Sequence, residues 1–156
     1  MIQQIEDTRI DYAREPFSEA LANEARPLIE KNWEETSHRH DIPLKPDMDK
    51  YKTLDERGFL AIFTARKKGA LVGYCVMLVS EFTHSKDKHY ASQDVVYISP
   101  EHRGFGPLFI NWCDGNLKRS GVSEVFRGSS EILDCGPLLE RIGYKPVSRL
   151  YSRRLS

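Results

Sequence analysis

Cysteine is scarce in this sequence, and its three residues, Cys75, Cys113 and Cys135, lie far apart. An odd number, with no Cys-x-x-Cys or Cys/His ligand spacing, argues against a disulfide framework and against a structural zinc site. Long apolar runs are missing too, because the longest, residues 70–79, is far too short to span a membrane. The N-terminal residues lack the basic-then-apolar order of a signal peptide, so we expect a cytoplasmic protein.

Net charge is absent as well, since 23 Lys and Arg residues balance 23 Asp and Glu residues. This balance gives no indication of a nucleic-acid partner, and no segment indicates a membrane partner. Residues 146–155 are locally basic, which is typical of an exposed strand edge, where charge prevents stray pairing. The 156 residues are enough to bury a substantial core, so a single domain over residues 1–156 is expected.

Helices are expected where apolar residues recur at helical spacing between capping or breaking residues. Pro27 makes the residue before it reluctant to be helical, so the first stretch should form two short helices or contain a kink. The helical stretches are residues 16–36, 47–57, 105–120 and 137–142.

Strands are expected where β-branched and aromatic residues lie between turn signals. The runs at 59–65 and 71–82 should form a hairpin, in which Gly73 indicates a bulge or a close backbone approach. The strand–helix–strand order over residues 95–127 predicts a parallel pair with a right-handed crossover. The fold class is therefore α+β, with a mixed sheet and helices on both faces. The predicted strands are residues 2–8, 59–65, 71–82, 95–98 and 122–127, with a final strand or strand pair at 144–155.

A turn with one arginine and two glycines follows the strand at residues 95–98. Residues 97–109 have the pattern of a strand end, a turn and a helix start. The N–H groups of such a turn can point at one spot, with the positive end of the helix dipole behind them, so the pattern predicts a phosphate-binding site. It is neither a P-loop, since no Gly-Lys-Ser/Thr follows, nor a G-x-G-x-x-G dinucleotide fingerprint.

In order and spacing, these elements resemble the GNAT superfamily of acyl-CoA-dependent N-acyltransferases over nearly the whole chain. Residues 69–74 resemble the family's turn and third strand, residues 95–104 its fourth strand and pyrophosphate turn, and residues 121–155 its C-terminal half. The resemblance implies a mostly antiparallel central sheet with a splayed parallel strand pair. It also implies acetyl-CoA as acyl donor, an amine acceptor and no metal.

One part of the resemblance is narrower. Asn32-Trp33-Glu34-Glu35, His84 and Asp94 resemble in particular a subgroup that bacteriophages often encode, which would place the protein in the host cytoplasm.

The family's Q/R-x-x-G-x-G/A turn fits this sequence in two registers. In one, Arg103 leads and Leu108 takes the last small position; in the other, Glu101 leads and both glycines are in place. We favour a shortened turn in which Arg103 meets phosphate by charge and the N–H groups of residues 104–108 surround it. The predicted cofactor-binding residues are Val96, Ile98, Arg103, Gly104, Phe105, Gly106, Leu108 and Ser130.

Acetyl transfer to a primary amine needs a neutral nucleophile, whereas a lysine-like amine has a pKa of about 10. A carboxylate or a histidine, directly or through water, must therefore take a proton. The reaction also needs a backbone donor for the developing oxyanion, which the splayed strand around residues 96–98 could provide, and an acid for the leaving thiolate.

Three residues are candidates for the base or the acceptor side. Asp94 is expected to share a strand face with Val96 and Ile98 upstream of the thioester, and its alternative role is capping a strand edge. His84 could line the acceptor cleft or be an exposed loop histidine. Glu35 could face the substrate or belong to a solvated helix face.

The general acid is less well marked, because Leu139 stands where many GNAT enzymes carry a tyrosine. Tyr97, or a water held by Ser129 or Ser130, could replace it, although Tyr97 could also be a sheet residue with a satisfied hydroxyl. Tyr144 is expected to pack rather than to react.

The leading hypothesis is an N-acetyltransferase that moves an acetyl group from acetyl-CoA to a primary amine by direct attack in a ternary complex. The alternatives are a catalytically weak or inactive CoA-binding module and a structural protein that pairs through its sheet edge. The acceptor is open, and so is the choice between a monomer and a homodimer.

Overall fold

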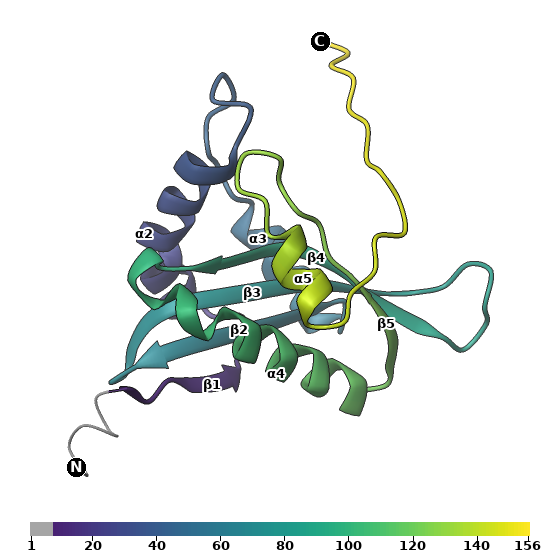
Figure 1. The fold of residues 1–156 in the computed structure, drawn as a ribbon, viewed down its shortest axis with the longest axis horizontal. Helices are drawn as coiled ribbons and strands as arrows, with labels where there is room; N and C mark the ends of the chain where they lie inside the picture. The colour runs from purple at the N-terminus through teal and green to yellow at the C-terminus, as the bar shows by residue number, and fades with distance from the viewer. Residues whose placement is uncertain (1–7) are drawn as a thin grey trace.

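Helices, an antiparallel hairpin and a strand–helix–strand unit follow one another along the chain in the predicted order. The computed structural model describes residues 8–156, so the strand predicted at residues 2–8 lies outside them, Thr8 apart. The elements are β1 (Asp11–Arg14), α2 (Glu19–Thr36), α3 (Met48–Glu56), β2 (Leu60–Lys67), β3 (Ala70–Glu81), β4 (His89–Ile98), the 3-10 helix η1 (Pro100–Phe105), α4 (Gly106–Arg119), β5 (Val122–Phe126) and α5 (Gly136–Arg141) (Figure 1).

The five strands form one sheet in the order β1-β2-β3-β4-β5. The pairs among β1 to β4 are antiparallel, whereas β4 and β5 are parallel and joined by α4. Their register ends at Ser92↔Phe126, although β4 continues to Ile98. From Gln93 onwards the two strands therefore splay apart. The predicted α+β class, with a mostly antiparallel sheet and a splayed parallel pair, is confirmed.

Strand β4 carries an irregularity that decides which way its side chains point. Its register with β3 shifts at Asp94, which has no partner of its own. A β-bulge of this kind inserts one residue and breaks the alternation of faces. The expectation that Asp94 shares a face with Val96 and Ile98 is therefore wrong: those two pack beneath α4, and Asp94 borders a cavity on the other side of the sheet. The close approach predicted at Gly73 is confirmed, since a Cβ there would lie 3.0 Å from the carbonyl oxygen of Tyr97.

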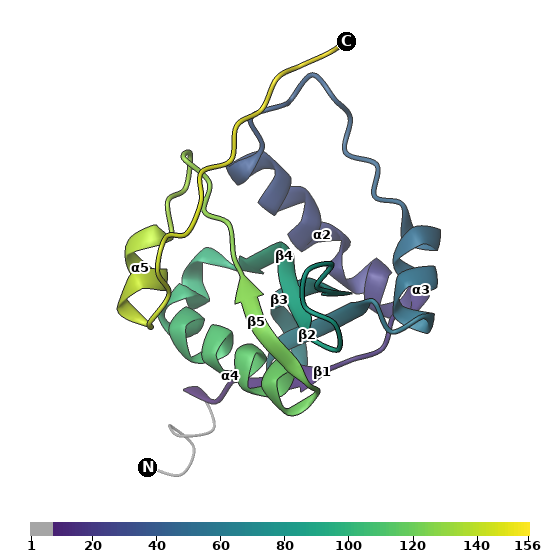
Figure 2. The same cartoon turned by 90° about the vertical axis from the view of Figure 1, so that its right-hand side faces the viewer.

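Each face of the sheet buries an apolar cluster against its helices. Figure 2 shows α4 and α5 on one side of the sheet and α2 and α3 on the other. The first cluster includes Phe63, Cys75 and Met77 of the sheet with Phe109, Cys113 and Leu117 of α4. The second includes Leu28 of α2 with Leu60, Ile62, Tyr74, Val76 and Tyr97 of the sheet.

Helix α2 runs without interruption over Glu19–Thr36, so the expectation of two short helices is wrong. Pro27 lies on the exposed side of the helix, whereas its neighbours Ala25 and Leu28 are buried. Packing of the buried side against the sheet holds the helix together, even though proline removes one backbone hydrogen bond.

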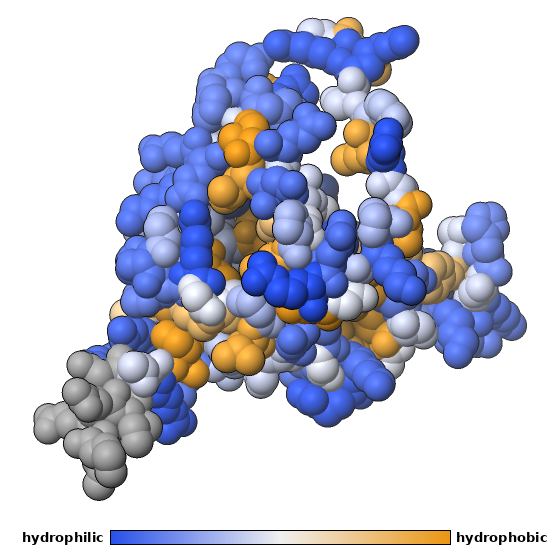
Figure 3. Space-filling model, viewed as in Figure 1, coloured by the Kyte–Doolittle hydropathy of each residue, from blue (hydrophilic) through white to orange (hydrophobic). Residues whose placement is uncertain are grey.

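The C-terminal tail, residues 144–156, contains no strand, so the predicted final strand or strand pair is wrong. A strand needs a partner, and the tail leads away from β5 instead of along it (Figure 1). Its large apolar residues Val147, Leu150, Tyr151 and Leu155 are exposed. Figure 3 shows hydrophobic side chains along this tail and also between α2 and α5. Within residues 8–156, no helix combines the length and the apolar character needed to cross a membrane.

Candidate active site

The glycine turn after β4 forms the 3-10 helix η1, which continues directly into α4. The N–H of His102 bonds the carbonyl oxygen of Ser99 at 2.8 Å, and the N–H of Gly106 bonds that of Arg103. Gly106 is buried, and a Cβ there would meet Ile98 Cδ1 at 3.3 Å, whereas a Cβ on Gly104 would meet nothing within 4 Å. Gly106 thus allows the turn to pack on β4, and Gly104 leaves open space on its outer side.

The side chains of three predicted site residues, Arg103, Glu35 and Tyr97, meet beside this turn. The guanidinium of Arg103 forms an ion pair with the carboxylate of Glu35 at the end of α2. Its Nε donates a hydrogen bond to the carbonyl oxygen of Ile98 at 3.1 Å. The guanidinium carbon of Arg103 lies over the ring of Tyr97, 5.8 Å from the ring centroid. The Tyr97 hydroxyl donates to the other oxygen of Glu35 at 3.2 Å. Arg103 therefore reaches the end of α2, with its guanidinium still partly exposed at 38%.

The environment of Tyr97 keeps its hydroxyl protonated at neutral pH. Burial raises the pKa of Tyr97, and the Glu35 carboxylate raises it further, partly opposed by Arg103. The hydroxyl is therefore protonated, and it donates this proton to the hydrogen bond with Glu35.

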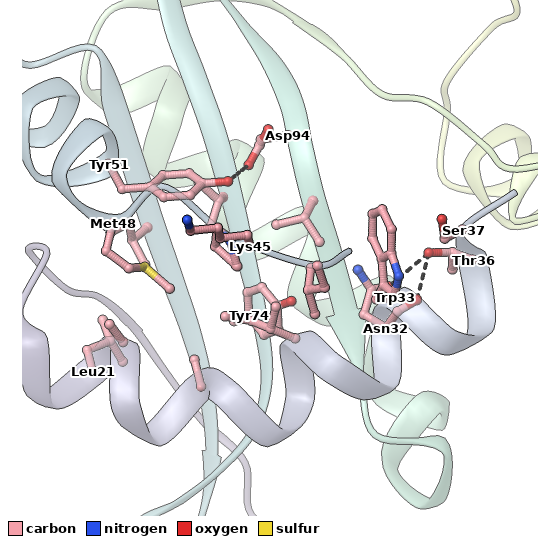
Figure 4. A pocket seen from close by; sticks show the side chains of 18 of the residues that line it. Leu21, Asn32, Trp33, Thr36, Ser37, Lys45, Met48, Tyr51, Tyr74 and Asp94 are labelled. Atoms are coloured by element: carbon pink, nitrogen blue, oxygen red, sulfur yellow. Dashed lines mark hydrogen bonds between the residues drawn. The ribbon is translucent and has the colours of Figure 1, made fainter. Parts of the chain in front are cut away.

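A cavity of about 590 Å³ lies between α2, residues 37–46, α3 and the sheet (Figure 4). Asp94 and Val95 of β4 form one part of its wall, so the cavity reaches the bulge beside the splayed strands. Its other lining residues include Leu21, Ile29, Asn32 and Trp33 of α2, Lys45, Met48 and Tyr51 around α3, and Ile62, Leu71, Tyr74 and Val76 of the sheet.

Asp94 is held at the wall of this cavity by Tyr51 of α3. The Tyr51 hydroxyl donates to Asp94 Oδ2 at 2.6 Å (Figure 4). Burial, and next the hydrogen bond to Asp94, raise the pKa of Tyr51 well above its ordinary value, so it remains a donor. Among residues 8–156, the Asp94 carboxylate accepts no second hydrogen bond, which leaves its Oδ1 available to a ligand. No sequence signal links the two residues, since they are 43 positions apart.

Two of the predicted residues lie apart from this assembly. His84 is exposed in the loop that joins β3 to β4, and it does not line the cavity beside Asp94. The Ser130 hydroxyl accepts a hydrogen bond from the N–H of Ile132 at 3.1 Å, within the loop before α5. Leu139, at the position where the family has a tyrosine, is buried at 7% exposure and belongs to the packing of α5.

The remaining predicted cofactor residues differ in exposure. Phe105 packs on Tyr12, with 6.2 Å between the ring centroids, whereas Leu108 is 66% exposed on α4. The side chains of Val96 and Ile98 pack towards α4, so they leave the backbone edge of β4 to face the splay.

A buried arginine links β4, α4 and the C-terminal segment at the point where β4 and β5 separate. The side chain of Arg127, directly after β5, has 0% exposure and pairs with Asp114 of α4 at 2.6 Å. It also donates to the Tyr144 hydroxyl at 2.9 Å and to Gln93 Oε1 of β4 at 3.2 Å. The sequence predicts only a packing role for Tyr144, and its hydroxyl also accepts this bond from Arg127. In the described part of the chain, no three His, Cys, Asp or Glu residues are grouped as a metal site would require.

No protein-family model matches the chain, and no curated protein does. Solved structures do. Ribosomal-protein-alanine N-acetyltransferase from Brucella melitensis biovar Abortus 2308 superposes with a TM-score of 0.72 at 20% identity, over 95% of this chain and 100% of that one.

Two further similar structures contain ligands. The aminoglycoside acetyltransferase meta-AAC0020 from an uncultured soil metagenomic sample, in complex with sisomicin, has a TM-score of 0.71 at 18% identity, over 93% and 96% of the two chains. AAC(6')-Iy, in complex with the bisubstrate analog CoA-S-monomethyl-acetylneamine, has a TM-score of 0.68 at 14% identity, over 95% and 99%. At such identities the likeness shows the fold, which is that of GNAT acetyltransferases, as the resemblance predicted.

Proposed function

We propose that this chain is an acetyl-CoA-dependent N-acetyltransferase that acts on a primary amine by direct attack in a ternary complex. One observation about strand β4 carries the proposal. Beyond Gln93 one edge of this strand is unpaired, and a turn of the phosphate-binding type follows its end. Its bulge directs the carboxylate of Asp94 towards a cavity on the opposite face of the sheet. This arrangement supports a donor site on one side of the strand and an acceptor site on the other.

The residues around the turn fit a CoA pyrophosphate. Arg103 offers a cationic guanidinium, Gly104 leaves open space, and the start of α4 adds the positive end of its dipole. The edge of β4 beyond Gln93 is open to an extended ligand, because β5 does not pair with it there. When bound, acetyl-CoA supplies an activated acetyl group as a thioester.

On the acceptor side, Asp94 is the residue that we assign to proton removal. Its Oδ1 can accept a proton from the ammonium group of the substrate, while Tyr51 holds Oδ2 in place. The N–H groups along the open edge at residues 96–98 are suited to stabilise a developing oxyanion. Tyr97, which keeps its proton at neutral pH, is the proposed acid: its hydroxyl would turn from Glu35 and give this proton to the leaving CoA thiolate.

Two measurements on the purified chain test the proposal. Isothermal titration should show acetyl-CoA binding at micromolar to sub-millimolar concentrations. Mass spectrometry should then show one added acetyl group on an amine from a broad panel, together with release of free CoA. If acetyl-CoA does not bind, the proposal fails at its first step.

A second candidate function is a CoA-binding module without turnover. The buried Leu139 favours it, because it removes the family's usual acid and leaves no hydroxyl at that position. Acetyl-CoA binding without acetyl transfer across the whole amine panel would support this candidate over the enzyme.

Homodimer formation is proposed from the open edge of β5 and the exposed apolar tail. Val147, Leu150, Tyr151 and Leu155 lie in an extended segment with no strand partner among the described residues, and a second copy could cover them. The phage-encoded subgroup and the cytoplasmic location stay predictions.

A further inference from the structure

The lining of the acceptor cavity carries a chemical pattern that the three-dimensional arrangement brings together. Its walls are mainly apolar and aromatic, built by α2, α3 and the sheet, as Figure 4 shows around Trp33, Tyr74 and Met48. Apolar surface of this kind contributes free energy of binding in proportion to the ligand surface that it removes from water. A ligand that uses this cavity well must therefore have an apolar body.

The lining carries few charged side chains, and more of them are cationic than anionic. Asp94 is the one carboxylate among the lining residues of this cavity in the described chain, whereas Arg39 and Lys45 contribute cationic groups and His38 an imidazole. Figure 4 shows Lys45 on the same side of the cavity as Tyr51 and Asp94. A ligand with one ammonium group can pair with Asp94. Each further ammonium group of a polyamine would lose water without an anionic partner and would face Arg39 and Lys45.

The volume is in keeping with a small molecule. About 590 Å³ lies within the range of about 300–1,000 Å³ typical of sites that bury small ligands. The Tyr51 hydroxyl, which bonds Asp94 at 2.6 Å, ties the anionic group to one end of the cavity. The amine of the ligand is thereby directed to the bulge of β4, with its body towards α2.

From these features we infer that the acceptor is a monoamine with an apolar, preferably aromatic, body, and that a polycationic amine is a poor acceptor. The inference rests on the proposed function, because it concerns the acceptor site of that reaction. It also separates this chain from meta-AAC0020, which was solved with the aminoglycoside sisomicin.

The first experiment compares acceptors. The purified full chain is given acetyl-CoA with either 2-phenylethylamine or sisomicin, and kcat/KM is measured for each. We expect kcat/KM for 2-phenylethylamine to exceed that for sisomicin by at least about tenfold, because the additional ammonium groups of sisomicin find no anionic partner in the lining. A higher value for sisomicin overturns the inference.

A charge reversal at the cavity supplies the matched test. Lys45→Glu adds a second carboxylate to the lining, whereas Lys52→Glu makes the same change on α3 at an exposed position outside the lining. Lys45→Glu should raise the sisomicin to 2-phenylethylamine ratio of kcat/KM by about tenfold, and Lys52→Glu should leave it unchanged. Equal effects of the two variants contradict the assignment of the cavity.

Amine binding can be measured without acetyl-CoA as well. Trp33 lines the cavity, so 2-phenylethylamine should change the tryptophan fluorescence of the chain, and Trp33→Phe should remove that change. Loss of acetyl-CoA binding would remove the proposed function itself. Intact acetyl-CoA binding with no fluorescence response and no turnover of the monoamine would remove only this inference.

Discussion

The guanidinium of Arg103 is paired with the carboxylate of Glu35, and this pair joins the turn after β4 to the last turn of α2. The two side chains are 38% and 30% exposed, so the pair is partly open to solvent. We have proposed Arg103 as the cation that meets the pyrophosphate of CoA. In that case the phosphate has to compete with Glu35 for the guanidinium.

This competition predicts an unusual gain of affinity. A partly exposed ion pair contributes about 0.2–1 kcal/mol, so Glu35→Gln should lower the Kd for CoA by a factor of roughly 1.4 to 5. Arg103→Met should raise that Kd by about tenfold or more, because it removes a charge-assisted hydrogen bond. Isothermal titration measures both.

The control for these two variants is Arg26→Met, which removes an exposed arginine from α2 away from the turn. It should leave CoA affinity unchanged. Weaker CoA binding by the Glu35→Gln variant would show that the ion pair organises the turn instead of competing with the ligand.

Asp94 and Tyr51 lead to a prediction about kcat. Asp94→Asn retains the size of the side chain and removes the base, so kcat should fall by about 10²–10⁴-fold with little change in acetyl-CoA affinity. Tyr51→Phe should reduce kcat by a smaller factor, since it only releases one oxygen of Asp94. Asp11→Asn, an exposed aspartate on β1, serves as the control. Full activity of the Asp94→Asn variant would exclude Asp94 as the base.

The buried arginine after β5 leads to a prediction about stability. Arg127→Met removes the buried cation that pairs with Asp114, whose carboxylate is 24% exposed and keeps the Tyr144 hydroxyl as a donor, so the free energy of unfolding should fall by about 1.5–3 kcal/mol. Arg9→Met breaks a pair with Asp11 that is 74% and 57% exposed, and its cost should stay within about 0.5 kcal/mol. Urea unfolding followed by circular dichroism compares the two variants. Similar costs would show that burial of Arg127 does not decide its contribution.

Buried tyrosines predict a loss of stability at high pH. Burial raises the pKa of Tyr74 well above its ordinary value of 10.0, so above pH 10 the unfolded chain loses this proton and the folded chain keeps it. Stability from this group is therefore complete below pH 10 and declines as the pH rises. At pH 11 the decline should be about 1.4 kcal/mol, and Tyr74→Phe should remove it. Urea midpoints of both proteins from pH 8 to 11 measure the difference, and parallel curves would refute the prediction.

The exposed tail predicts an effect on oligomeric state. If a second copy covers it, light scattering on a size-exclusion column should give twice the 18.0 kDa of one chain. Replacing Leu150 and Tyr151 together by Asp should then return the monomer, because both side chains are exposed at 100% and 85% and take no part in the core. A monomer before the substitutions would rule out the homodimer.

Several local features could be predicted from the sequence because they depend on short-range physics. The hairpin of β2 and β3 follows from two apolar runs around a Lys-Lys-Gly turn, and the right-handed unit of β4, α4 and β5 follows from strand–helix–strand order. Gly73 indicated its close contact with β4 because glycine within a strand lacks a Cβ. The composition of the tail predicts a strand, but pairing depends on a neighbour that the tail itself does not specify.

The sequence by itself determined the order of elements, the phosphate-type turn and the residue types available for proton transfer. The tertiary structure alone decided which of them meet. The bulge at Asp94 turned that carboxylate towards Tyr51, the end of α2 brought Glu35 to Arg103 and Tyr97, and His84 stayed in an exposed loop. The physical reason is that each of these contacts joins residues more than 40 positions apart, whose approach depends on strand register and helix packing and leaves no local pattern in the chain.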